Sequence, residues 1–189
     1  VITGLKYAKG DIIVVSDADD TYPLEHVHKF LNIMKKRDID YLITDRLTNS
    51  SRKAFPGPHL VGNKLLNLLF FCIFRCRFSD SQSGLLIFKK SLVNPYVLPF
   101  FGKHFAFNSE LKFHLYKRAQ KIAVIPIPYR RRMYGLTKQQ WYKTGTKILA
   151  SWLKTKFFLL LITKKIPDYP SIDLVRLPLI EDEIPRSFL

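Results

Sequence analysis

Short apolar runs alternate along this chain with longer stretches in which apolar residues recur at helical spacing. Strands are expected where apolar and β-branched residues run together, at 11–16, 39–44, 84–88 and 121–127. Helices are expected from Pro23 onward, over the strongly apolar residues 60–78, and from a cap at Asn108 or Ser109 to about Ala119. This alternation predicts an α/β fold in which at least some strands of the sheet are parallel.

The last third of the chain has a different pattern. Residues 141–163 are rich in Leu, Ile, Phe and Trp, but lysines recur at 143, 147, 154 and 156. A helix that crosses a bilayer needs about 20 apolar residues with few charges, so we expect an amphipathic helix that either lies in a membrane interface or packs on the sheet. The chain is therefore divided into a domain at 1–140, an amphipathic membrane-associated helix at 141–165 and an extended tail at 166–189.

The composition adds a strong positive charge to this picture. Apolar residues make up 47% of the 189 residues, enough for a core, and the formal net charge is +16. Such a surplus favours an anionic partner, namely a nucleic acid, a lipid surface or a phosphorylated substrate. The sequence begins at Val1 without a methionine or a signal-peptide pattern, so we expect an N-terminally truncated protein.

Carboxylates follow the first predicted strand directly, in the order Asp17-Ala18-Asp19-Asp20-Thr21. In an open α/β sheet, ligands bind beyond the carboxyl ends of strands, so these side chains are expected to face a crevice. Two carboxylates two residues apart can share one divalent cation, and oxygen ligands favour Mg²⁺ or Mn²⁺. A simpler alternative is the favourable placement of acidic residues ahead of a helix, which accounts for Asp19 and Asp20 but poorly for Asp17.

The spacing Asp-x-Asp-x-Thr also resembles the start of haloacid-dehalogenase-type phosphatases, in which Asp17 would be the nucleophile and Asp19 the acid/base. Such phosphatases further need a Ser or Thr after a later strand, a Lys, and another acidic pair. Thr44-Asp45 is a candidate for the second motif, but no convincing later acidic pair follows. The remaining motifs favour a different family.

Three segments in order carry that second resemblance. Residues 4–23, GLKYAKGDIIVVSDADDTYP, resemble the segment around the Asp-x-Asp motif of family 2 glycosyltransferases. Residues 80–92, DSQSGLLIFKKSL, resemble the Asp-x-x-x-Gly-Phe-Arg segment of dolichyl-phosphate mannosyl- and glucosyltransferase-like enzymes. Residues 125–138, IPIPYRRRMYGLTK, resemble that group's strand followed by Arg-x-x-Gly-x-Ser-Lys. Each segment alone is a weak signal, whereas three in the same order are specific.

The resemblance implies a GT-A fold, a Rossmann-like, mixed but mostly parallel sheet flanked by helices, here without the family's first nucleotide-binding strands. It also implies a nucleotide-sugar donor, a polyprenyl or dolichyl phosphate acceptor, and a divalent cation held by Asp17 and Asp19. The implied catalytic residues are Asp19, Glu110 and Arg46. The implied phosphate-binding residues are Arg46, Arg132, Thr137 and Lys138, and the loop that closes the site holds Asp80, Gln82, Ser83 and Gly84.

Several of these assignments compete with a simpler one. Arg132 and Lys138 lie in a segment that can wrap a diphosphate, but a basic run is more often a solvated surface. Glu110 is also a favourable charge near a helix N-terminus, and Asp80 can simply close a turn. Leu85-Leu86 replaces the Phe-Arg of many relatives, which removes one cationic contact.

The expected function is inverting transfer of a sugar from a nucleotide diphosphate to a polyprenyl phosphate by a protein bound peripherally to the cytoplasmic face of a membrane. A phosphate monoester is already anionic near pH 7, so the acceptor needs no strong general base. The base-binding strands are expected to come from a missing N-terminal segment or a partner chain. The alternatives are the phosphatase and a non-catalytic basic protein that binds a membrane or a nucleic acid, although no nucleic-acid-binding pattern is visible.

Overall fold

The computed structural model describes residues 1–48, 57–93, 105–130, 141–162 and 173–177. The elements, in chain order, are α1 (Ile2–Tyr7), β1 (Ile12–Val15), η1 (Leu24–His26), α2 (Val27–Arg37), β2 (Tyr41–Asp45), α3 (Gly57–Phe74), β3 (Leu86–Lys89), η2 (Lys90–Leu92), α4 (Phe105–Arg118), β4 (Lys121–Pro126), α5 (Trp141–Ile162) and β5 (Asp173–Arg176). Strands and helices alternate through most of this order, as the sequence predicts.

The described strands form one sheet in the order β1-β3-β2-β4-β5. β3 runs antiparallel to both of its neighbours, β1 and β2, whereas β2, β4 and β5 pair in parallel. Because β1 and β2 are each antiparallel to β3, they share one direction, and only β3 is reversed. The predicted mixed, mostly parallel sheet is therefore confirmed.

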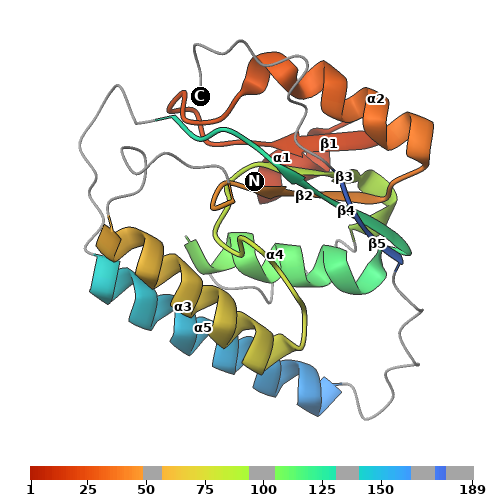
Figure 1. Ribbon diagram of the computed structural model, residues 1–189. Coiled ribbons are helices and arrows are strands. Elements are labelled where there is room, and N and C mark those ends of the chain that lie inside the picture. Colours follow the sequence, from red (N-terminus) through yellow and green to blue (C-terminus); the bar gives the residue numbers. More distant parts are fainter. Residues whose placement is uncertain (49–56, 94–104, 131–140, 163–172, 178–189) are drawn as a thin grey trace.

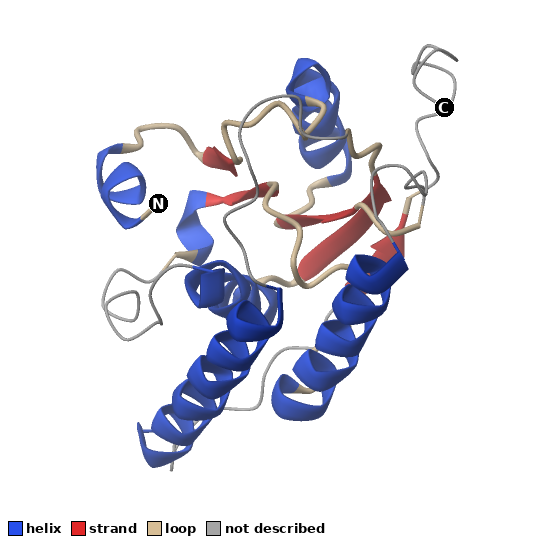
Figure 2. Cartoon of the chain, turned by 90° about the vertical axis from the view of Figure 1, so that its left-hand side faces the viewer, coloured by secondary structure: helices blue, strands red, loops and turns tan. Residues whose placement is uncertain are grey.

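Helices cover both faces of this sheet (Figures 1 and 2). Side chains of a strand alternate between the two faces, so Tyr41 and Ile43 of β2 join one core cluster and Leu42 joins the other. The cluster of Tyr41 contains residues of α1, α3, α4 and α5, and the cluster of Leu42 contains Phe30 and Met34 of α2. β2 is buried along its whole length because it lies in the middle of these layers.

Two predicted helix boundaries were wrong. The apolar helix ends at Phe74 and not at residue 78, because Arg75 adopts a left-handed backbone conformation with φ of 57°. Phe78 still enters the core, from a segment outside the helix. Asn108 and Ser109 are not caps, since α4 already begins at Phe105 and both residues lie inside it.

The C-terminal helix α5 packs on the domain, which is one of the two arrangements expected from its sequence. Ile148 and Trp152 of α5 are buried, and the Trp152 ring lies 5.0 Å from that of Phe70 on α3. Residues 173–176 were predicted as part of an extended tail, but they form β5, which pairs with β4 at the edge of the sheet. Neither β5 nor α1 was predicted from the sequence.

Candidate active site

The candidate site lies at one edge of the sheet. β1, β2 and β4 run in the same direction and end at this edge, so the residues that follow them, including Asp17, Arg46 and Tyr129, are brought to one place. β3 runs the other way and begins there, so the segment Ser79–Gly84, here called the site loop, meets the same edge. Three separate predicted segments thus converge on one location.

Arg46 and Asp80 form a buried ion pair at the centre of this edge. Arg46 Nε lies 2.6 Å from Asp80 Oδ2 and Nη2 lies 3.0 Å from Oδ1, so the ion pair is bidentate. Burial by itself raises the pKa of Asp80, but the charge and hydrogen bonds of Arg46 hold that pKa below its usual value. Burial likewise lowers the pKa of Arg46, and the Asp80 carboxylate more than reverses this. Both groups therefore stay charged.

Tyr22 links this ion pair to the site loop. Its hydroxyl accepts hydrogen bonds from Arg46 Nη1, at 3.3 Å, and from the backbone N–H of Gly84. Burial raises the pKa of Tyr22 well above its usual value, so the phenol stays protonated. The Tyr129 ring lies edge-on to Tyr22 and 4.9 Å from Arg46 Cζ, a cation–π contact. Tyr22 was not predicted as a site residue from the sequence, because its contacts are with two distant partners.

Asp17 lies directly against Gly84. A Cβ atom added at Gly84 would come within 2.3 Å of Asp17 Oδ2 and 2.9 Å of the Tyr22 hydroxyl. Only glycine permits this approach, which explains why a Gly follows Ser83 at the end of the site loop. The structure therefore brings together Asp17 and the predicted loop residues, which lie more than sixty positions apart.

Asp19 is oriented by its own turn. Its Oδ1 accepts hydrogen bonds from the side chain of Thr21, at 2.6 Å, and from the Thr21 backbone N–H, at 3.3 Å. Within the described residues there is no cluster of three or more metal-ligating side chains. Mg²⁺ is commonly held by one or two carboxylates and completed by water and substrate phosphates. Asp17 and Asp19 supply carboxylate oxygens of the type that such a cation prefers.

Side chains from several elements fix the site loop. Asn67 of α3 spans it, donating to the Ser79 carbonyl at 2.6 Å and accepting from the Ser81 N–H at 2.7 Å. Ser83 Oγ lies 2.7 Å from Thr44 Oγ1 on β2. The loop is thus held from both the helical layer and the sheet.

Asp80 and Gln82 close the turn of the loop itself. The Gln82 N–H donates to Asp80 Oδ1 at 3.1 Å, and the Gln82 side chain donates to Ser81 Oγ at 3.1 Å. Asp80 therefore closes a turn, as the simpler interpretation expected, and also pairs with Arg46.

Lys112 of α4 contacts the backbone of the site loop. Its ammonium donates to the Asp80 carbonyl at 3.2 Å and to the Ser81 carbonyl at 3.0 Å. The residue is only 1% exposed, and burial lowers its pKa to about 7. Lys112 was not among the residues predicted from the sequence, although its helical register with the core residues Leu115 and Ala119 places it on the inward face of α4.

The remaining predicted site residues are placed differently. The described hydrogen bonds of Glu110 are to α5, where its Oε1 accepts from Ser151 at 2.8 Å and from Thr155 at 2.9 Å. These bonds attach α5 to α4. Three predicted phosphate-binding residues lie outside the described segments: Arg132, Thr137 and Lys138.

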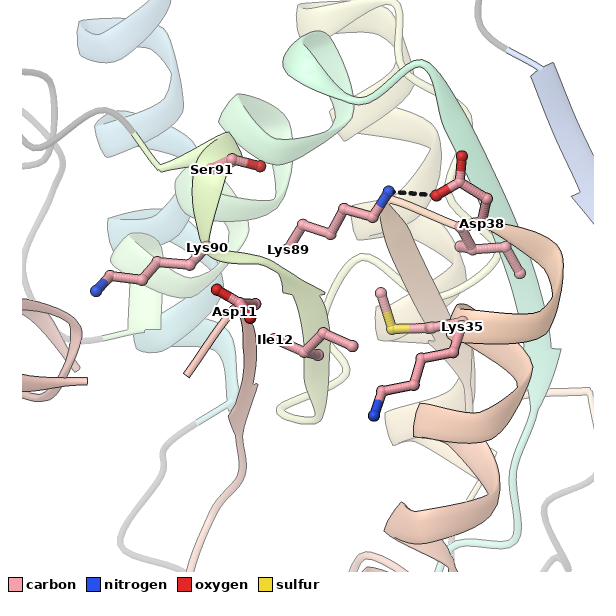
Figure 3. A pocket seen from close by; sticks show the side chains of 9 residues that line it. Asp11, Ile12, Lys35, Asp38, Lys89, Lys90 and Ser91 are labelled. Atoms are coloured by element: carbon pink, nitrogen blue, oxygen red, sulfur yellow. Dashed lines mark hydrogen bonds and ion pairs between the residues drawn. The ribbon is translucent and has the colours of Figure 1, made fainter. Parts of the chain in front are cut away.

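A separate hollow of about 660 Å³ lies at the opposite edge of the sheet, where β1 begins and β3 ends (Figure 3). Lys35 and Lys90 are among its lining residues. The ammonium of Lys89 is paired with Asp38 and Asp40 at 2.7 and 2.8 Å. The carboxylates that follow β1 lie at the other edge, so we place the candidate active site there.

Comparison with known proteins identifies the family of this chain. The family model described as glycosyl transferase family 2 matches residues 1–109. A dolichyl-phosphate hexose transferase of Haloferax volcanii is 28% identical over 143 residues, which cover 76% of this chain and 60% of that protein. A UDP-N-acetylglucosamine–dolichyl-phosphate N-acetylglucosaminyltransferase of Methanococcus voltae is 28% identical over 159 residues, covering 82% of this chain and 63% of that protein.

The chain thus spans a little over half of the length of these two relatives. The family match covers β1, the acidic motif, Arg46 and the site loop, which are the same elements that converge at the sheet edge. It also decides against the phosphatase interpretation of the Asp-x-Asp-x-Thr spacing. From its sequence, its sheet and its converging motifs, this chain belongs to glycosyl transferase family 2.

Proposed function

We propose that this protein transfers a sugar from a nucleotide-sugar donor to a polyprenyl or dolichyl phosphate at a membrane surface. The observation that carries the proposal is the packing of Asp17 against Gly84, which joins the acidic motif to the site loop and its Arg46–Asp80 pair. The two relatives described above are named for dolichyl-phosphate glycosyl transfer, which supports the same acceptor class.

In this proposal, Asp17 and Asp19 would hold Mg²⁺ or Mn²⁺, which when bound neutralises the charge of a departing nucleoside diphosphate. The motif resemblance supports phosphate binding by Arg132, Thr137 and Lys138. The acceptor phosphate already carries the attacking negative charge near pH 7, so catalysis consists of positioning and charge stabilisation.

Arg46 has a different role in this proposal from the one its motif suggests. Three of its N–H groups point to Asp80 and Tyr22, and the residue is only 6% exposed. Breaking such a buried pair is costly, because each partner would leave the other as an uncompensated charge. We therefore assign Arg46 to holding the site loop in place, with the acceptor phosphate bound elsewhere at the same edge.

The membrane part of the proposal rests on exposed apolar side chains of α3 and α5. Val61, Leu65 and Leu68 recur at intervals of four and three residues on one face of α3 and are between 55% and 67% exposed. Leu153 and Phe157 are similarly exposed on α5, which packs beside α3 (Figure 1). None of the described helices is long and apolar enough to cross a bilayer. We propose that these faces enter the membrane interface, with neighbouring lysines at the headgroups.

Vesicle flotation tests the membrane part. The protein should float with vesicles that contain about 30% anionic phospholipid, and a Leu65→Ser, Leu68→Ser double variant should float markedly less. A control variant, Lys35→Ser and Lys36→Ser on α2, removes two exposed lysines but no Leu, Val or Phe side chain, and it should float more than the double leucine variant. Equal flotation of wild type and the double leucine variant would refute the assignment of α3.

Sugar transfer tests the catalytic part. The full-length protein should transfer sugar from a nucleotide diphosphate donor to a polyprenyl phosphate in the presence of Mn²⁺, and Asp19→Ala should remove most of that activity. A protein that instead releases phosphate from simple phosphate esters, with no sugar transfer, would overturn the proposal in favour of the phosphatase.

A further inference from the structure

The ammonium of Lys112 is buried beneath the site loop, where a cation is unexpected. Lysine is almost never fully buried unless it is paired. Its two hydrogen-bond acceptors are consecutive backbone carbonyls, those of Asp80 and Ser81. Among the residues that the structure describes, no carboxylate forms an ion pair with Lys112. The lysine is therefore held by the loop backbone.

The charged groups near Lys112 are Asp80, Arg46 and Asp17. Asp80 is already paired with Arg46, so its carboxylate is not a counterion reserved for Lys112. The electrostatic partners that favour its charged form are Asp80 and Asp17. The hydrogen bonds of the ammonium join α4 to the backbone of the site loop.

The carbonyls that Lys112 holds also determine the rest of the loop. With these two carbonyls directed toward α4, the Ser81 N–H meets Asn67 and the Gln82 N–H meets the Asp80 carboxylate. Two residues further on, Gly84 lies so close to Asp17 that a single added carbon would collide with it. A shift of the loop would therefore be transmitted directly to Asp17.

We propose that Lys112 is a positioning residue for sugar transfer, whose ammonium fixes the carbonyls of Asp80 and Ser81 and thereby holds Gly84 against Asp17. This inference rests on the proposed function. The positioning role proposed for Lys112 differs from a general role in folding. An apolar side chain of similar size would fill the same space but would leave the carbonyls of Asp80 and Ser81 without their donor.

The test compares Lys112→Met, which removes the donors with a side chain that is unbranched like lysine and one atom shorter, with Lys36→Met, which removes an exposed lysine of α2. Hydrogen exchange of the purified protein is followed by mass spectrometry on peptides that cover the site loop, β2 and β4. Lys112→Met should speed exchange about tenfold or more in the loop peptide and less than about twofold in the strands, because only local opening is eased. Lys36→Met should exchange like wild type throughout.

Kinetics on the full-length protein give the second readout. Misplacement of a reacting group by about 1 Å can cost about 10²-fold in rate, so kcat of Lys112→Met should fall at least tenfold while KM for the donor changes less than about threefold. Unchanged loop exchange, or an unchanged kcat, would overturn the inference. If Lys112→Met does not fold, Lys112→Gln decides by the same two measurements, since it keeps an N–H donor without the charge and should show smaller effects of the same kind.

The two proposals fail separately. If wild type transfers no sugar, the proposed function fails, and faster loop exchange in Lys112→Met would still support the positioning of the loop. If wild type is active and neither exchange nor kcat responds to Lys112, the inference fails and the proposed function stands.

Discussion

Alanine at position 84 would place a methyl group where the Asp17 carboxylate now lies. The added Cβ would be 2.3 Å from Asp17 Oδ2 and 3.0 Å from its Cγ. Ordinary van der Waals contacts of a Cβ atom begin at 3.4 Å, so the Asp17 carboxylate must move by about 1 Å or the site loop must retreat by the same amount. The backbone of Gly84 is not in the left-handed region, so the effect of this substitution is steric.

The size of the effect follows from that displacement. Overpacking of a buried site typically costs about 1–3 kcal/mol, and Gly84→Ala should lower the free energy of unfolding by that amount. Displacing a group that supports a metal ligand commonly costs 10–100-fold in metal affinity, and Gly84→Ala should weaken Mn²⁺ binding by roughly as much.

Electron paramagnetic resonance of unbound Mn²⁺ in titrations of the purified protein measures this affinity, and urea unfolding measures the stability. Gly62→Ala is the matched control, because a Cβ added there meets nothing within 4 Å. As a Gly-to-Ala change inside α3, it should leave Mn²⁺ binding unchanged and raise stability by about 0.5–1 kcal/mol. Wild-type Mn²⁺ affinity in Gly84→Ala would refute the close packing of Asp17 on the loop as a determinant of the metal site.

Three further predictions concern the buried charges. Asp80→Asn should lower the free energy of unfolding by about 3–5 kcal/mol in urea, because Arg46 would remain buried without its countercharge, and a loss below about 1 kcal/mol would contradict that burial. Glu110→Gln keeps an acceptor oxygen for Ser151 and Thr155, so kcat should stay within about threefold of wild type, whereas a general acid or base at this position predicts a loss of about 10²–10⁴. The pKa of Lys112 is lowered to about 7 from 10.5, so between these values the unfolded chain binds a proton that the folded protein has released. Stability of wild type should therefore rise from pH 7 to pH 9 relative to Lys112→Met, by up to about 1.4 kcal/mol per pH unit, and a constant difference in urea unfolding would contradict the shift.

Much of the sheet could be predicted because its strands are short apolar runs with clear ends. β2 reads as a strand from its own residues, and its burial on both faces agrees with that pattern. The end of α3 could not be predicted in the same way, because Phe78 continues the apolar pattern after the helix has stopped. β5 was missed for a related reason, since its four residues form a strand only through pairing with β4.

Some residues of the candidate site could be proposed from sequence motifs, and others could not. Asp17, Asp19 and Gly84 could be proposed as site residues from their motifs, because a motif depends on residue type and order. Lys112 and Tyr22 act through partners 31 and 62 positions away, so no local pattern distinguishes them from a surface lysine and a core aromatic residue. The catalytic role expected for Glu110 stays a prediction, and the described hydrogen bonds of this residue are with Ser151 and Thr155 of α5.

We propose that Asp17 and Asp19 serve sugar transfer to a polyprenyl phosphate. The most direct measurement is Mn²⁺-dependent transfer of radiolabelled sugar from nucleotide donors to a polyprenyl phosphate by the full-length protein, for wild type, Asp19→Ala and the exposed control Lys36→Met. We predict labelled lipid product with wild type and Lys36→Met, and a loss of at least about 10²-fold with Asp19→Ala, on the scale of removing one group that stabilises transition-state charge. Equal transfer by wild type and Asp19→Ala would contradict the role assigned to the acidic pair.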